Sequence, residues 1–292
     1  DIQTKAALDP NAGNFNDFAN SIRAMRRHEI ERIGLAWMSG VIDDEASLAG
    51  MTDVYDAAIE ASLQWAIQHR INDIQIDEAP AAIAIIGMGR YGGREVNFSS
   101  DADVIIIYRP AEGADDDQAN LFARKVQEDL RAILQGPTTF EPKIELDMDL
   151  RPEGKNGPLV RSYASCEEYY RSWASTWEHQ ALLRARYAAG DASLAEDFLM
   201  NIADPLRYPK IDLTETQIAE IRKLKARMEA ERLPRGVRRD RHLKLGKGGL
   251  SDVEWTIQLL QLQHAGDNAN LRVNGTLQAL NELEHRKLIS AG

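Results

Sequence analysis

The stretch that decides the fold is AAIAIIGMGRYGGREVNFSSDADVIIIY, residues 81–108. It begins with an apolar run, Ala81 to Ile86, that predicts a buried strand, and it ends with a second apolar run, Val104 to Ile107. Between the runs lie four glycines within seven residues, followed by Ser-Ser-Asp-Ala-Asp. The pattern predicts a strand, a glycine turn, a short helix and a second strand, with two acids where the second strand opens.

The two acids, Asp101 and Asp103, are expected to act together. Side chains two positions apart on a strand share a face, so both carboxylates are expected to project the same way. Neighbouring carboxylates repel each other unless a cation neutralises them. The glycine turn frees backbone N–H groups, which suit phosphate oxygens. Together these features predict a site for a metal-bound nucleoside triphosphate.

Two other interpretations of the same stretch compete with this one. Residues 87–92, GMGRYG, fit the dinucleotide fingerprint GxGxxG, which is a weak signal alone. That fingerprint requires an acid at the far end of the second strand, whereas here residues 107–110 read Ile-Tyr-Arg-Pro. The two acids also fit a polar turn in front of a strand. The glycines, the serines and a third acid later in the chain favour the triphosphate site.

A third acid comes from residues 143–150, KIELDMDL, which alternate between apolar and mainly acidic positions. Such alternation predicts a strand. If this strand lies beside the one that carries Asp101 and Asp103, its acids can complete a three-carboxylate cluster, which suits two Mg²⁺ ions and an in-line displacement at phosphorus. The alternative for Asp147 and Asp149 is the solvent face of an edge strand.

Two cationic segments are candidates for phosphate contacts. The turn after the alternating segment places Arg151 and Lys155 close to the acids, where they would neutralise phosphate charge; a plain surface turn is the alternative. The strongest cationic patch covers residues 233–249 and is rich in glycine. Lys244 and Lys247 are its candidate phosphate contacts, and a solvated loop is the alternative.

The rest of the chain shows helical periodicity, with apolar residues recurring at three- to five-residue steps. Helices are expected at residues 15–38, 47–69 and 118–134 and, after Ser162, at 166–188, 194–202, 213–232, 251–262 and 275–289. This divides the chain into an N-terminal helical segment at 1–75, a mixed helix-and-strand core at 76–160 and a C-terminal helical domain at 161–292.

Isolated histidines and tryptophans in the helices are interpreted as structural. His28 and His69 lie among charged residues and are expected to be solvated. Trp37 and Trp65 are expected to anchor the core. His179, beside Glu and Gln, is expected to pack between helices rather than to act as a general base.

Composition limits the classes of function. The net charge of −11 argues against a general nucleic-acid binder. No apolar run approaches the length of a membrane span, and the N-terminus is no secretory signal, so no membrane association is expected. The single cysteine, Cys166, excludes an internal disulfide and favours a cytoplasmic protein. The absence of an initial methionine, and an end just after a helical pattern, suggest a piece of a longer chain.

These residues resemble the nucleotidyltransferase superfamily of DNA polymerase β, whose mark is a glycine turn followed by Asp-x-Asp and a third acid on a later strand. The nearer resemblance is to bacterial glutamine synthetase adenylyltransferase, the bifunctional adenylyl-transferring and adenylyl-removing enzyme. The stretches that carry it are GMGRYGGREVNFSSDADV (87–104), LDMDLRPEGKNGPLV (146–160), WASTWEHQALLRAR (173–186) and RHLKLGKGGLSDVEW (241–255).

The resemblance implies an α+β fold: a polymerase β-like nucleotidyltransferase core with a mixed sheet, flanked by extensive helical regions. It also implies that Asp101, Asp103 and Asp147 hold two Mg²⁺ ions, one lowering the pKa of the attacking hydroxyl and the other stabilising the pyrophosphate leaving group. The family's third acid stands five residues before the proline of the LRP turn, which is Asp147 here. Asp149 occupies a position where the family usually has another residue.

The phosphates of the nucleotide would then face Gly87, Gly89 and Ser100, with Arg90 as a charge partner. The implied substrate is ATP, and the implied reaction moves AMP to a tyrosine hydroxyl of glutamine synthetase, in control of nitrogen assimilation. A PII-type signal protein is the implied partner of the full-length enzyme.

Each enzyme of this family has two similar halves, one that adds AMP and one that removes it by phosphorolysis. The WEHQAL and HLKLGKGGLSDVEW forms favour the C-terminal, adenylylating half of an actinobacterial member. Three alternatives stay open: the adenylyl-removing half, a uridylyl- or other nucleotidyltransferase, and a non-catalytic module that binds nucleotide.

Overall fold

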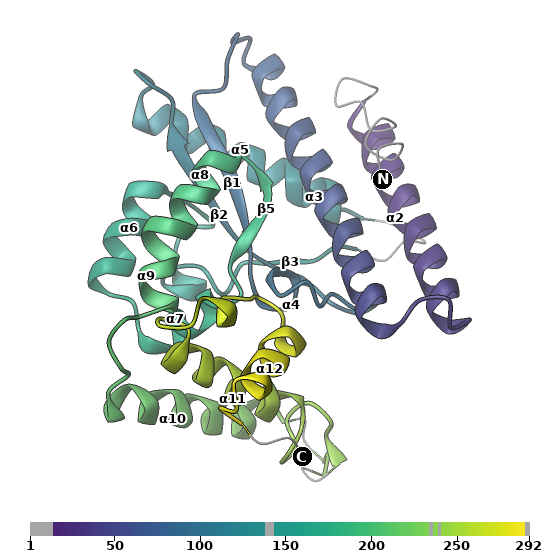
Figure 1. Ribbon diagram of the computed structural model, residues 1–292. Helices are drawn as coiled ribbons and strands as arrows, with labels where there is room; N and C mark the ends of the chain where they lie inside the picture. The colour runs from purple at the N-terminus through teal and green to yellow at the C-terminus, as the bar shows by residue number, and fades with distance from the viewer. Residues whose placement is uncertain (1–13, 138–142, 234–235, 239–240, 290–292) are drawn as a thin grey trace. The chain divides into compact units, whose positions relative to one another are not determined.

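The computed structural model describes residues 14–137, 143–233, 236–238 and 241–289, and its fold is α+β, as the sequence predicts (Figure 1). Contacts within the chain define two compact units. The first unit comprises residues 1–172 and 184–199, and the second comprises 173–183 and 200–292. The three-part division at residues 75 and 160 stays a prediction.

The first unit is built on a five-stranded sheet with the order β3-β2-β1-β5, and β4 also pairs with β2. The strands are β1 (Ala81–Gly87), β2 (Ala102–Pro110), β3 (Leu146–Asp147), β4 (Val160–Ser162) and β5 (Arg186–Gly190). β1 runs antiparallel to β2 and β5, whereas β2 runs parallel to β3 and β4. The sheet is therefore mixed, as expected, and the two apolar runs of the opening stretch are neighbouring strands.

One face of this sheet is covered by helices. Ile83 and Ile85 of β1, with Val104 and Ile106 of β2, belong to one buried cluster together with residues of three helices. These helices are α2 (Phe15–Met38), α3 (Asp44–Asp73) and α5 (Asp116–Gln135). Burying each such isoleucine or valine contributes about 1.5–3 kcal/mol to stability. Because side chains alternate along a strand, the residues between these positions face the other side of the sheet. They are buried as well, and α6 (Tyr163–Ser172) and α8 (Ala192–Phe198) contact β2 and β1.

The three covering helices begin at side-chain caps. Asn14, Asp43 and Asp115 each accept a hydrogen bond from a backbone N–H in the first turn of the following helix. Asp115 belongs to an acidic run after β2, so that run starts α5. Figure 1 shows α2 and α3 side by side, joined by a short turn. An ion-paired hydrogen bond of 2.7 Å from Arg70 to Asp129 ties α3 to α5.

The predicted strand at residues 143–150 is mostly wrong, because only Leu146–Asp147 pair as β3. The chain turns directly afterwards: the Asp147 carboxylate accepts the backbone N–H of Asp149 at 2.7 Å. Ile144, Leu146 and Met148 are nevertheless all buried in the same cluster. The alternating pattern therefore reflects an extended segment that is buried on one side. Only Leu146 and Asp147 of this segment pair with a neighbouring strand.

The predicted helix at residues 166–188 is also wrong. The segment forms α6 (Tyr163–Ser172), α7 (Thr176–Leu182) and then β5. A capping box of Ser175 and Glu178 starts α7 as a separate helix. Residues 186–190 become a strand because they pair with the open edge of β1, a tertiary contact that overrides local propensity. Gly190 ends the strand at φ +87°, where a Cβ would clash with the carbonyl oxygen of Ile83.

Short elements complete the first unit, and the second unit is helical. The first unit also contains α4 (Gly89–Gly92), the 3₁₀ turn η1 (Gly154–Asn156) and α8 (Ala192–Phe198). After the π-helical turn η2 (Leu199–Ala203) come α9 (Asp204–Arg207), α10 (Glu215–Arg232), α11 (Leu250–His264), the 3₁₀ turn η4 (Ala269–Leu271) and α12 (Thr276–His285). The helices α10, α11 and α12 agree with the predicted helices at 213–232, 251–262 and 275–289 to within a few residues, whereas α9 and η4 were not predicted. Their core includes Leu183, Ile221 and Leu262.

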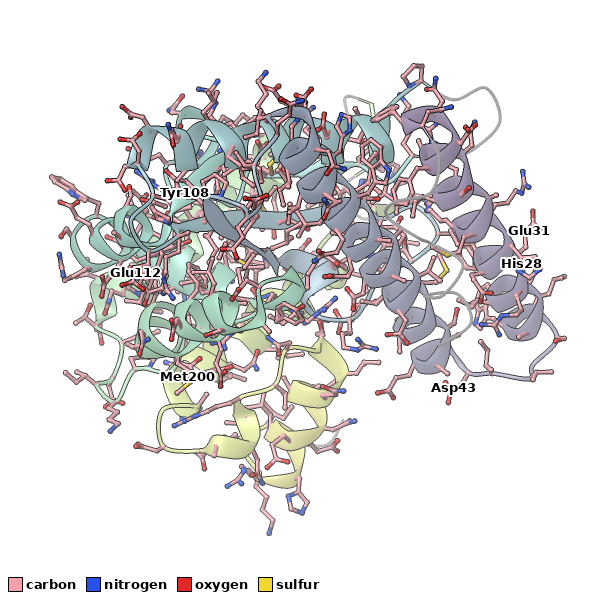
Figure 2. The ribbon with its side chains drawn as sticks, turned by 90° about the horizontal axis from the view of Figure 1, so that it is seen from above. His28, Glu31, Asp43, Tyr108, Glu112 and Met200 are labelled. Carbon is pink, nitrogen blue, oxygen red and sulfur yellow. The ribbon has the colours of Figure 1, made fainter. Side chains whose placement is uncertain are left out.

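The predictions for the isolated histidines and for Trp65 are confirmed, and the prediction for Trp37 is wrong. His28 is exposed and points outward from α2 (Figure 2), and His69 is exposed, although its ring stacks on Trp65. Trp65 is 4% exposed and anchors the core as predicted. Trp37 does not: it is 41% exposed, and its indole N–H donates to Asp44 at 2.6 Å. Within the described residues, no helix is long and apolar enough to cross a membrane.

The thiol of Cys166, the single cysteine, provides a test of this fold. It is fully buried on α6, and burial raises its pKa from 9.0 to about 12. At pH 8 its thiolate fraction is therefore roughly a thousandfold below that of an ordinary thiol. A chromogenic disulfide reagent is expected to label the native chain far more slowly than the chain unfolded in guanidinium. Equal labelling rates in the two states would contradict the burial of α6.

Candidate functional site

The acids predicted from separate parts of the sequence lie on neighbouring strands. Asp103 of β2 and Asp147 of β3 are direct partners in the parallel register. Ala102, Val104 and Leu146 flank them and belong to the buried cluster under the helices. The alternation of side chains therefore puts both carboxylates on the opposite face of the sheet. The pairing that the three-acid hypothesis requires is confirmed.

Asp101 lies one residue before β2 and is exposed, whereas Asp103 and Asp147 are half-buried. Asp101 and Asp147 line the same cavity, which has a volume of about 340 Å³ and which we call the acid cavity. Asp149 and Lys155 also line it. Two of the three predicted acids thus share a cavity, and the third is the strand partner of one of them.

The glycine turn is pressed against Asp103. Gly89 opens α4 at φ +52°, and a Cβ at this position would clash with Oδ2 of the Asp103 carboxylate. The N–H of Met88 donates to the carbonyl oxygen of Asp103 at 2.8 Å. Only glycine satisfies both the backbone angle and the close approach. The turn and the acid therefore form one local structure.

The other glycines of the turn serve packing. Gly87 is the last residue of β1, and a Cβ there would lie 3.2 Å from the ring of Tyr91. A Cβ at Gly92 would clash with the carbonyl oxygen of Arg184. These positions let β1, α4 and the chain before β5 approach one another closely.

Ser100 and Arg90 are close to the acids in sequence, but their surroundings differ. The Ser100 hydroxyl accepts the N–H of Asn97 and donates to the Asn97 side chain, both at 3.0 Å. The Ser100 carbonyl oxygen accepts the hydroxyl of Tyr55 at 2.9 Å. Ser100 therefore builds the turn before β2. Arg90 lies in α4 and is half-buried.

An arginine on β5 holds the glycine turn in place, and sequence reasoning missed this role. Arg186 donates to the carbonyl oxygen of Tyr91 at 3.1 Å and to Asp56 of α3 at 2.8 Å. Its guanidinium also lies over the Tyr91 ring, 4.8 Å from the centroid. Nearby, Arg184 pairs with Glu95 at 3.5 Å. The signal was the pair of arginines in WASTWEHQALLRAR, but only the position of β5 gives them these partners.

The turn after β3 has a different role from the one expected. Arg151 is 6% exposed and donates to the carbonyl oxygens of Met148 at 2.7 Å and Gly157 at 3.0 Å. Its guanidinium therefore stabilises the turn. Lys155 is exposed, and its Nζ lies 3.2 Å from the Asp149 carboxylate, so these two side chains form an ion pair.

The carboxylates fit a magnesium ion by chemistry, since Mg²⁺ prefers oxygen ligands from one or two carboxylates and keeps several waters. Among the residues that the structure describes, no three acidic, histidine or cysteine side chains are gathered as ligands of one metal ion. The three-aspartate metal site therefore stays a prediction. Its supporting observations are the strand pairing and the cavity.

Lys244 and Lys247 belong to the second unit, whereas the acids belong to the first. Both lysines are exposed in the loop before α11. Asp252 in the first turn of α11 accepts the N–H of Gly248 at 2.6 Å and pairs with Lys225 of α10. The hydrogen bond from Lys225 lowers the pKa of Asp252. The phosphate-contact role of the two lysines stays a prediction, and Arg235 and Arg239 of the same patch lie outside the described residues.

His179 lies on α7 and is half-buried. Burial lowers the pKa of its imidazole, so the neutral form is favoured. Its neighbours on the helix, Glu178 and Gln180, are both buried, and Gln180 donates to Gln258 of α11 at 2.7 Å. This is consistent with the predicted packing position in the helical unit.

Comparison with known proteins identifies related families. The family model described as glutamate-ammonia ligase adenylyltransferase matches residues 3–201. A model described as GlnD PII-uridylyltransferase matches residues 220–292. The first match contains the sheet, the glycine turn and all three acids.

The curated relatives carry the name "bifunctional glutamine synthetase adenylyltransferase/adenylyl-removing enzyme". One from Bifidobacterium longum is 76% identical over 291 residues, which is 100% of this chain and 27% of the relative. Relatives from Mycobacterium tuberculosis and Mycobacterium avium are 46% identical over 277 residues and 44% identical over 290 residues. These alignments cover 94% and 98% of this chain, and 28% and 29% of the relatives. The chain thus spans under a third of the length of these relatives, and it belongs to the glutamate-ammonia ligase adenylyltransferase family.

Proposed function

We propose that this chain is a nucleotidyltransferase unit that moves AMP from ATP to a tyrosine hydroxyl of glutamine synthetase. Glutamine synthetase as the protein substrate, a cytoplasmic location and control by a PII-type signal protein through the longer enzyme are parts of this proposal. The relatives' names support the adenylyl chemistry. The WEHQAL and HLKLGKGGLSDVEW forms favour the adenylylating half.

One observation carries the proposal: Asp103 lies beside Asp147 in the strand register while Gly89 lies against the Asp103 carboxylate. The pairing brings two acids to one face of the sheet. The glycine turn lies beside them, and in this proposal its backbone N–H groups contact phosphate oxygens, which such groups suit. An acid cluster next to a phosphate-binding turn is the arrangement that phosphoryl and nucleotidyl transfer require.

In the proposed reaction, the tyrosine oxygen attacks the α-phosphorus of ATP. The bond between this phosphorus and the oxygen that bridges to the β-phosphate breaks, and pyrophosphate leaves. The tyrosine proton passes to solvent. The residues of this chain position the two reactants: the glycine turn holds the phosphates, and the face with Asp103 and Asp147 lies opposite the helical layer.

Asp101, Asp103 and Asp147 would hold the Mg²⁺ ions, which when bound would acidify the tyrosine hydroxyl and stabilise the leaving group. The oxygen atoms of these carboxylates are the kind of ligand that Mg²⁺ prefers.

Removal of AMP by phosphorolysis is the second candidate, because the relatives' names contain both activities. In that reaction a phosphate oxygen attacks the phosphorus of AMP-tyrosine, and the bond to the tyrosine oxygen breaks, so that ADP forms. The same acids would serve both directions of transfer. Product analysis separates the two activities.

The test of the proposed function mixes the chain with Mg²⁺, α-labelled ATP and unmodified glutamine synthetase. Label on the synthetase supports adenylyl transfer. In parallel, AMP-modified synthetase is incubated with phosphate, and ADP without labelling would assign the chain to the removing half. Metal-dependent ATP binding with neither product would favour a non-catalytic module. If the synthetase were labelled from α-labelled UTP in preference to ATP, the proposal that ATP is the nucleotide substrate would be contradicted.

Neutralising one acid tests the site. Asp103→Asn and Asp147→Asn are each expected to lower the transfer rate by roughly a hundredfold or more, because a charge that stabilises the transition state is lost. The measurement is initial rate at saturating ATP. Asp117→Asn, an exposed acid in the first turn of α5, serves as the control. Wild-type rates in both site variants would refute the assignment.

A matched pair of glycine substitutions tests the contact between the turn and the acid. Gly89 and Gly113 both have positive φ, at +52° and +78°, so alanine costs about 1–3 kcal/mol of strain at either position. Only at Gly89 does the new Cβ meet the Asp103 carboxylate; nothing lies within 4 Å of a Cβ at Gly113. Gly89→Ala is therefore expected to lose transfer activity, whereas Gly113→Ala keeps it with a similar loss in thermal stability. Equal activity in the two variants would argue against the role of the turn.

A further inference from the structure

A second and larger cavity lies along α5 in the first unit. It has a volume of about 820 Å³ and is bounded by one side of α5 and by the turn between β3 and β4. We call it the α5 groove, and its main polar lining is Asn120, Arg124, Gln127, Arg131 and Lys155. No motif in the sequence singles out these α5 residues. The apolar side of the same helix packs in the core, so the polar side is free to line a groove.

The groove carries more positive than negative charge. Arg124 and Arg131 are exposed, and neither has a carboxylate within ion-pairing distance among the residues that the structure describes. The Nε of Arg131 donates to Gln135 at 2.8 Å, a bond that fixes the guanidinium without neutralising it. The lining also contains Glu128, whose carboxylate lies 2.8 Å from the Nζ of Lys125. This lysine offsets the negative charge of Glu128. The hydrogen bond from Lys125 and the charge of Arg124 both lower the pKa of Glu128, and Lys155 pairs with Asp149 at 3.2 Å. Arg131 has no carboxylate partner among the residues that the structure describes, so the lining keeps more positive than negative charge.

The spacing of the arginines indicates the size of the anion. Arg124 and Arg131 are seven residues apart on one helix, which is about 10 Å along the axis. A single carboxylate or phosphate can contact one of them well. A longer anion with charges at both ends can contact both, and guanidinium groups bind phosphate oxygens through paired N–H donors. The spacing therefore favours a chain of linked phosphates.

The α5 groove adjoins the acid cavity. Arg131, Gln135 and Lys155 line both cavities. An anion in the α5 groove would thus lie next to the cavity that contains Asp101 and Asp147, on the side where the charge is positive. This position is distinct from the glycine turn, which lies against Asp103.

We propose that the α5 groove is a binding site for a phosphoanhydride anion, either pyrophosphate or the polyphosphate chain of a nucleotide. Arg124, Arg131 and Lys155 supply the cationic contacts. The site goes beyond the proposed AMP transfer and does not depend on it, since an anion of this class binds there without any reaction.

The test is calorimetric titration of the whole chain with sodium pyrophosphate in buffer containing EDTA. Without metal ions the acids repel the anion, and the groove variants then decide whether binding belongs to the α5 groove or to the glycine turn or the loop with Lys244 and Lys247. A dissociation constant below about 1 mM is expected for the wild-type chain. Arg131→Gln is expected to weaken binding roughly tenfold or more, and Arg124→Gln to weaken it in the same direction, because a charge-assisted hydrogen bond is lost.

Controls separate the site from general electrostatics and from misfolding. Arg171→Gln removes an exposed arginine from α6 in the same unit, outside the lining of both cavities, and is expected to bind pyrophosphate like the wild type. Far-ultraviolet circular dichroism and the thermal midpoint verify the fold of each variant. Equal weakening by Arg131→Gln and Arg171→Gln would overturn the proposal, as would wild-type affinity in Arg131→Gln.

Competition identifies the source of the phosphate chain. Displacement of pyrophosphate by ATP at a lower concentration than by inorganic tripolyphosphate supports a nucleotide occupant, and equal displacement supports free polyphosphate. Glutarate serves as the dicarboxylate probe, and tighter binding of glutarate than of pyrophosphate would overturn the ligand class. Because no turnover is measured, failure here leaves the proposed AMP transfer untouched, and failure of the transfer assay leaves this site untouched.

Discussion

The backbone pairing of β2 is the constraint on which the candidate site depends. From Val104 to Pro110 this strand pairs with the whole of β1, and it also pairs with β3 at the end where it begins and with β4 further along. With partners on both edges, β2 cannot change register by one residue without moving its apolar side chains out of the core. Asp103 therefore has a fixed face, and its neighbour Asp147 shares that face through β3. The positions of the two acids are therefore set by the burial of the apolar side chains next to them on these strands.

The glycine turn adds a second constraint, because it ties β1 to β2 at the same end of the sheet. Gly89 lies against the Asp103 carboxylate, and Arg186 holds the carbonyl oxygen of Tyr91 in the turn. Arg186 also reaches Asp56 on α3, so the turn is connected to the helical layer. Hydrogen bonds of Arg186 thus connect the turn with β5 and α3. The α5 groove, in contrast, depends on exposed side chains of a helix whose other side is buried.

Predictions from the sequence were correct where an apolar pattern reflects burial. They were wrong where the structure of a segment depends on which strand it pairs with. The opening stretch gave both central strands and the turn, because continuous apolar runs and clustered glycines have few alternative structures. Residues 143–150 alternate as a strand does, yet only two of them pair, since the chain turns at Asp147 to place Arg151 among carbonyl oxygens. Trp37 matched the helical period and is still exposed near the end of α2.

By itself, the sequence determined most of the helices to within a few residues, the β1–turn–β2 unit, the mixed α+β class and the three candidate acids. These features follow from local patterns and from the resemblance of four motifs to a known family. The tertiary structure decided that residues 186–190 form a strand, that Arg151 is structural, and that Arg124 and Arg131 line a groove. No local pattern contains this information. A strand at a sheet edge is specified by its partner, and a guanidinium group has a role only once its surroundings are assembled.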